Sequence, residues 1–115
     1  MLIGELVERT GVSARSLRYY EEQGLLAPER SGNGYRVFDD ADVVVAQQIR
    51  GLIEAGFGTE IIAQLLPCAR GTAPEIELCP SVVAAMTRVL AEIEERHRDL
   101  GRRRDTVRAL LTSDR

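Results

Sequence analysis

The strongest constraint on the fold is a heptad repeat of apolar residues in the last third of the chain. Nine positions alternate steps of three and four residues, and seven of the nine are apolar. We call this set the heptad stripe; it consists of Val83, Met86, Leu90, Ile93, His97, Leu100, Arg104, Val107 and Leu111. The spacing predicts one helix over residues 81–111, about 45 Å long.

A narrow stripe of this length favours pairing with a second helix. The rest of a 115-residue chain is too small to cover all of it. The simplest partner is the same helix of a second copy. The alternative is a long helix that folds back on its own domain.

The first 26 residues have the pattern of two short helices joined by a tight turn. A helix over about residues 4–9 is followed by "TGVS", in which Gly11 suits a positive φ and Ser13 is a good N-cap. The next helix runs from about Ala14 to Gln23, with Gly24 as its C-terminal cap. This arrangement is typical of a helix-turn-helix.

The following segment predicts a small hairpin and then two helices. Asn33-Gly34 is a two-residue hairpin signal between short β-prone stretches. A third helix begins after a cap at Asp39 or Asp40 and ends at Gly56, and Thr59 caps a short fourth helix.

Pro67 stops that fourth helix, and the sequence changes character after it. Residues 67–80 contain three prolines and a glycine and are interpreted as a linker. The predicted divisions are therefore 1–66, the linker 67–80, the long helix 81–111 and a short tail 112–115.

Charge and composition narrow the classes of function. The chain has a net charge of −3, and all 15 of its basic residues are arginine. No apolar run approaches the roughly 20 residues of a membrane span, and the N-terminus has no signal peptide, so we expect a cytoplasmic protein without membrane partners. No nucleophile–base pair or phosphate-binding loop is evident, so we expect no enzymatic activity.

The second predicted helix has one face suited to DNA. Arg15, Arg18, Tyr19 and Glu22 recur at helical spacing opposite Leu17. Arginine reads guanine or binds phosphate, and tyrosine donates to phosphate. A solvated face explains the helix alone equally well. The hairpin favours DNA, because it adds a second group of phosphate donors, namely Arg30, Asn33, Tyr35 and Arg36.

The motifs together resemble one family. "IGELVERTGVSARSLRYYEEQGLL", followed by "NGYRVF" and "LIEAGFGTEIIAQLL", is similar to the MerR family of bacterial transcription regulators over residues 2–66. The resemblance implies a mainly α protein with a winged helix-turn-helix domain and a long antiparallel coiled-coil dimerisation helix. It also implies a homodimer on a pseudo-palindromic promoter operator, which is bent or untwisted so that RNA polymerase can engage.

The resemblance extends to individual residues. Arg15, Arg18, Tyr19 and Tyr20 match the family's recognition helix, and Tyr35 and Arg36 match its wing. Together with the helical spacing, these matches predict double-stranded DNA as the partner. The candidate DNA contacts are Arg15, Ser16, Arg18, Tyr19, Tyr20, Arg30, Asn33, Tyr35 and Arg36. An interaction adaptor that uses its coiled coil is the alternative from another class.

Cys68 and Cys79 are candidates for a sensor. They are read as small buried residues, as a thiol–disulfide switch or as part of a metal site, with no cofactor as the default. Metal-sensing relatives use a cysteine near the start of the dimerisation helix, which Cys79 matches, and later cysteines, which this sequence lacks. With so few residues after the long helix, we expect no drug-binding or cobalamin-binding domain.

His97 and Arg104 are polar positions in the apolar stripe. His97 lies near the midpoint of residues 81–111, so in an antiparallel dimer it approaches its symmetry mate. We interpret it as a residue that fixes the register of the helices. A pH-sensitive histidine pair is the alternative.

Overall fold

The computed structural model describes residues 1–71 and 75–113. They belong to two units, which span Met1–Leu78 and Cys79–Arg115. The first unit holds α1 (Ile3–Thr10), α2 (Ala14–Glu22), β1 (Glu29–Arg30), β2 (Arg36–Val37), α3 (Asp40–Glu54), α4 (Thr59–Leu65), the 3₁₀ turn η1 (Leu66–Cys68), β3 (Ala69–Arg70) and β4 (Glu75–Ile76). The second holds α5 (Pro80–Leu111).

The turn between α1 and α2 confirms the predicted helix-turn-helix. Gly11 has a φ of 74°, and its N–H donates to the carbonyl of Val7 at 2.9 Å. The side chain of Ser13 caps α2 by accepting from the N–H of Ser16 at 3.1 Å. Leu6 and Leu17 anchor the two helices and are almost completely buried. The turn therefore fixes α2 with one face held to the core.

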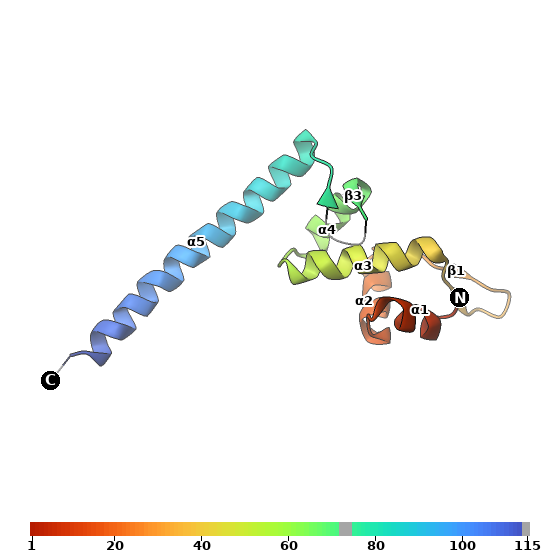
Figure 1. Ribbon diagram of the computed structural model, residues 1–115, viewed down its shortest axis with the longest axis horizontal. Coiled ribbons are helices and arrows are strands. Elements are labelled where there is room, and N and C mark those ends of the chain that lie inside the picture. The colour runs from red at the N-terminus through yellow and green to blue at the C-terminus, as the bar shows by residue number, and fades with distance from the viewer. Residues whose placement is uncertain (72–74, 114–115) are drawn as a thin grey trace. The chain divides into compact units, whose positions relative to one another are not determined.

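Helix α3 is the centre of the first unit and contacts α1, α2, α4 and η1 (Figure 1). Its N-terminus carries a capping box between Asp39 and Asp42, which decides between the two predicted caps. The largest fully buried side chains are Leu6, Leu17, Ile49, Leu52, Ile62 and Leu65. One hydrophobic core therefore holds all four helices of this unit together.

The cap of α4 differs from the prediction. Gly58, rather than Thr59, is the N-cap residue, and no side chain caps the helix. The hydroxyl of Thr59 donates instead to the Oε1 atom of Gln23 at 3.2 Å. The threonine thus links α4 to the residue that follows α2.

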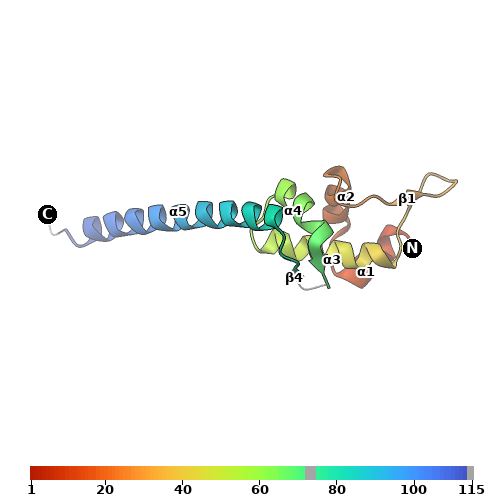
Figure 2. The ribbon, with the colours of Figure 1, turned by 90° about the horizontal axis from the view of Figure 1, so that it is seen from above.

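The predicted hairpin is present, but its turn is different. Strand β1 pairs antiparallel with β2, and the loop projects beyond the helices in both views (Figures 1 and 2). The N–H of Gly34 donates to the carbonyl of Ser31 at 2.9 Å, so Gly32 and Asn33 are the central turn residues. Within this loop only Gly34 has a positive φ, 80°, which is the geometry of a three-residue loop rather than the predicted two-residue turn.

The segment interpreted as a linker contains ordered structure. After η1, strand β3 pairs antiparallel with β4, and the buried side chain of Gln48 donates to the carbonyl of Gly71 at 2.9 Å. This bond ties the second hairpin to α3. Residues 72–74 of the linker and 114–115 of the tail lie outside the described residues.

Helix α5 is continuous over 32 residues, with Cys79 as its N-cap and Pro80 in its first turn. Along its middle and C-terminal part the heptad stripe is open to solvent, since Leu90 and Leu100 are 56% and 62% exposed. Among the described helices, none is long and apolar enough to cross a membrane.

Candidate nucleic-acid interface

Helix α2 has a buried face and an exposed face. Leu17 and Tyr20 are 1% and 4% exposed and pack into the core. On the other face Arg15, Arg18 and Tyr19 are exposed, while Ser16 is half-buried beside the cap. Because Leu17 holds the helix in place, the two arginines and the phenol of Tyr19 are presented outward on a fixed element.

Tyr20 is a candidate DNA contact in the sequence, but the structure places its side chain in the core. Its ring is a core group, and desolvation by burial raises the pKa of its phenol. Arg50 offsets part of this increase in the pKa, and Glu54 adds to it. Tyr20 therefore stabilises the position of α2, and the exposed candidate contacts on this helix are its neighbours.

The wing is the hairpin of β1 and β2, with the loop between them. Tyr35 is 64% exposed, and Asn33 is exposed at the turn. Arg30 and Arg36 are directly opposed cross-strand partners. The wing therefore presents two guanidinium groups, a phenol and an amide from a very short pair of strands.

One glutamate connects α2 to the wing. Arg36 donates through Nε to the Oε2 atom of Glu21. The Nη2 atom of Arg30 lies 3.6 Å from the Oε1 atom of the same carboxylate. Both wing arginines therefore share one carboxylate on α2.

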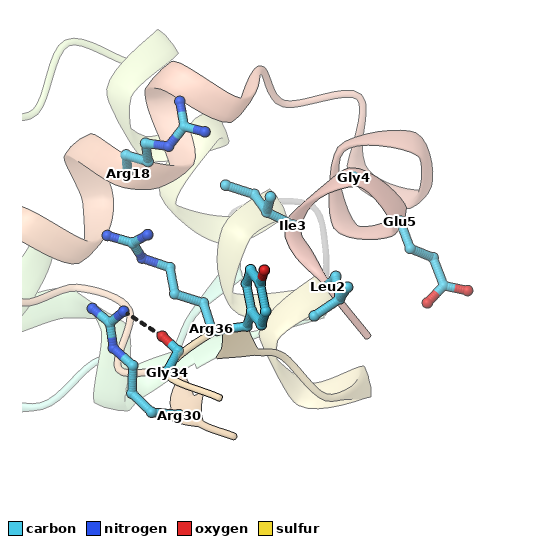
Figure 3. Close-up of a pocket in the computed structure, with 9 residues that line it drawn as sticks. Leu2, Ile3, Gly4, Glu5, Arg18, Arg30, Gly34 and Arg36 are labelled. Carbon is cyan, nitrogen blue, oxygen red and sulfur yellow. Dashed lines mark hydrogen bonds between the residues drawn. The ribbon is translucent and has the colours of Figure 1, made fainter. Parts of the chain in front are cut away.

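A cavity of about 530 Å³ lies between the start of α1, α2 and the wing (Figure 3). Its lining includes three arginines, Arg18 from α2 and Arg30 and Arg36 from the wing. Tyr35 lines it too, and Arg30 also donates to the carbonyl of Gly34 at 3.1 Å. The structure thus brings four predicted site residues to one concave, cationic surface, which suits a phosphate backbone.

The remaining candidates lie outside this cavity. Arg15, Ser16 and Tyr19 belong to the first turns of α2, and Asn33 is at the tip of the wing. Glu21 was not among the candidate DNA contacts predicted from the sequence. Its spacing of three residues from Arg18 places it on the same side of the helix, but its contact with the wing depends on how the hairpin folds.

The two cysteines are both half-buried and belong to different units of the chain. The Sγ atom of Cys79 lies 3.4 Å from the hydroxyl oxygen of Ser81. Within residues 1–71 and 75–113, no group of three or more potential metal ligands comes together.

The family model "MerR HTH family regulatory protein" matches residues 1–68, which include α1 to α4 and the wing. The chain belongs to this family. Membership explains why a helix-turn-helix is followed by a wing that carries arginine and tyrosine.

A curated MerR-family relative matches beyond this region. The HTH-type transcriptional regulator HmrR of Rhizobium leguminosarum bv. viciae is 37% identical over 107 residues, which cover 87% of this chain and 81% of HmrR. The match therefore extends into α5.

Solved structures have the same fold. PbrR691 of Ralstonia metallidurans CH34, in complex with lead(II), is 25% identical with a TM-score of 0.82, over 100% of this chain and 90% of that one. HiNmlR, a MerR family regulator lacking the sensor domain and bound to promoter DNA, is 20% identical with a TM-score of 0.55, over 96% and 77%. The latter likeness shows the fold alone.

These findings establish the class of the protein. It is a MerR-type DNA-binding transcription regulator, and its family and relatives are regulators rather than enzymes. They do not favour the alternative of an adaptor.

Proposed function

We propose that the exposed face of α2 and the wing bind promoter DNA together. The observation that carries this proposal is the cavity that Arg18 of α2 lines together with Arg30 and Arg36 of the wing, against one acidic lining residue, Glu5. In a helix-turn-helix the N-terminal part of the second helix approaches the bases, which assigns base contact to Arg15. The three cavity arginines, with the hydroxyls of Tyr19 and Tyr35, then bind phosphates.

The remaining two predicted contacts act at the edges of this surface. Ser16 lies in the first turn of α2 next to Arg15, and Asn33 at the wing tip is a further donor to the backbone. Tyr20 contributes by holding α2 against the core.

We propose that the protein binds as a homodimer through the heptad stripe of α5. Leu90, Ile93, Leu100 and Val107 are each about half exposed or more within one chain, which leaves their apolar surface available to a second copy. We place the two helices antiparallel, with His97 near the two-fold axis, where it fixes the register. A two-fold dimer presents two copies of α2 to the half-sites of a pseudo-palindromic operator.

The regulatory step is assigned to deformation of the DNA. Bending or untwisting a promoter costs several kcal/mol, and clamps on the phosphates must supply that energy. The wing and α2 of two protomers provide such clamps on both sides of the operator. The realigned promoter is then recognised by RNA polymerase, and the protein acts in the cytoplasm where this promoter is transcribed.

Binding of the protein to its own upstream region tests the assignment of the surface. Arg15→Ala and Arg18→Ala each remove one exposed side chain of α2 and leave α5 unchanged. We expect both variants to lose affinity while they remain dimers by sedimentation. Retained affinity in both variants would refute the assignment of α2 as the recognition helix.

A response through Cys68 and Cys79 is a second proposal. PbrR691 was solved in complex with lead(II), which favours a soft metal ion as the signal for some family members. Since no group of three or more potential metal ligands comes together among the described residues, we derive no step through a metal. Mass spectrometry of the reduced, oxidised and lead(II)-treated dimer, compared with Cys79→Ser, tests the role of the thiol.

A further inference from the structure

We infer that Glu21 is a positioning residue for DNA binding: its carboxylate holds the wing arginines Arg30 and Arg36 against the recognition helix. This inference rests on the proposed DNA-binding surface. It gives a role to an acidic residue that, from charge alone, would be expected to repel DNA.

The wing is too small to hold itself in place. Each of its strands has two residues, and a two-stranded hairpin of this kind is marginally stable at best. At the far end of β2, the amino group of Met1 donates to the carbonyl of Phe38 at 2.5 Å. The N–H of Phe38 in turn donates a hydrogen bond to the carbonyl of Met1 at 2.7 Å. These bonds anchor the base of the wing, but they leave its arginines unrestrained.

The wing also contains an unfavourable pair of charges. Arg30 and Arg36 face each other directly across the strands, and like charges in this position destabilise a hairpin. The carboxylate of Glu21 contacts both guanidinium groups and offsets their repulsion. A single acidic side chain from α2 therefore makes this arginine pair possible.

The same contacts preorganise the arginines. The Glu21 side chain is 21% exposed and that of Arg36 is 35% exposed, so this ion pair is partly shielded from solvent. Arg36 uses its Nε atom to bind Glu21, which leaves its two terminal nitrogens as donors for a phosphate. The guanidinium group of Arg30 is held at both terminal nitrogens, Nη1 by the carbonyl of Gly34 and Nη2 by the carboxylate of Glu21. Groups that are already fixed lose less side-chain entropy when they bind.

Glu8 is the matched control. It carries the same charge and is exposed on α1, outside α2, the wing and the lining of the cavity. Glu21→Gln and Glu8→Gln therefore make the same chemical change, one inside the proposed surface and one outside it. If charge alone matters, neither variant binds DNA more weakly; if Glu21 positions the wing, only Glu21→Gln does.

The test measures affinity for the protein's own upstream region by fluorescence anisotropy over a range of salt concentrations. We expect Glu21→Gln to weaken binding by about fivefold, the combined effect of losing the two partly shielded ion pairs of a dimer. Loss of one phosphate contact per protomer would also make the plot of log K against log salt shallower by about two. Glu8→Gln should retain or increase affinity, with no shallower slope. Glu21→Asp, which keeps the charge, should restore part of the loss.

The salt slope separates positioning from a general loss of folded protein. Partial unfolding lowers the active fraction but leaves the slope of the remaining folded protein unchanged. Equal or tighter binding by Glu21→Gln, with an unchanged or steeper slope, would overturn the inference. If Arg18→Ala still loses affinity in that case, the proposed surface stands without a role for Glu21. If Arg15→Ala and Arg18→Ala also bind normally, both the surface and the inference are wrong.

Discussion

Replacing Leu90 by alanine tests whether the heptad stripe joins two copies of the chain. Leu90 is 56% exposed within one chain, and fully burying a leucine contributes about 2 kcal/mol. Its exposed fraction therefore represents about 1 kcal/mol of further burial in each protomer. Since two-fold symmetry counts each substitution twice, Leu90→Ala should weaken the dimer by about 2 kcal/mol, or roughly 30-fold in dissociation constant.

Leu2 offers a control with the same chemistry. It is also 56% exposed, but it precedes α1 and lies far from the stripe in sequence. Sedimentation equilibrium over a range of protein concentrations would give the dissociation constants of wild type, Leu90→Ala and Leu2→Ala. We expect a change only in Leu90→Ala. Equal constants for the two variants, or a monomeric wild type, would refute the reasoning about the stripe.

Further predictions concern the turn, the wing and the core. Ser13→Ala removes the cap of α2 and should lower the free energy of unfolding by about 1 kcal/mol in a urea titration. Gly34→Ala forces a side chain into a positive φ and should weaken DNA binding in a gel shift, whereas Gly32→Ala, which has open space and no positive φ, should not. Above pH 10 the Tyr20 phenol ionises in the unfolded chain before it does in the folded one, because burial raises its folded pKa. Stability should therefore fall as the pH rises through about 10, the ordinary pKa of a tyrosine, and Tyr20→Phe should reduce that fall; an equal fall in both proteins would contradict it.

Local chemistry explains which parts of the fold the sequence predicts well. Gly11 ends α1 through its positive φ, and Ser13 caps α2 through a hydrogen bond to a residue three positions later. Because both effects are local, they can be predicted without the rest of the chain. The split between buried Leu17 and exposed Arg18 follows from helical spacing alone. The helix-turn-helix and the long helix α5 were predictable for this reason.

Other features depend on neighbours that local patterns do not specify. Asn33-Gly34 fits a two-residue turn, but the positive φ of Gly34 serves equally well at the last position of the three-residue loop that the structure adopts. Thr59 fits a cap, but Gln23 of another segment binds its hydroxyl. The contact between Glu21 and the wing requires two segments to be folded together, so spacing could not reveal it.

The salt dependence of operator binding tests the central claim most directly, because that claim places arginines of α2 and the wing on phosphates. The proposal assigns one phosphate contact to each of Arg18, Arg30 and Arg36, which line one cavity, and therefore three contacts per protomer and six per dimer. Each contributes about 0.9 to the slope, so a plot of log K against log salt should have a slope of about −5. A slope near −1, with specific binding preserved, would contradict a phosphate clamp formed by these residues.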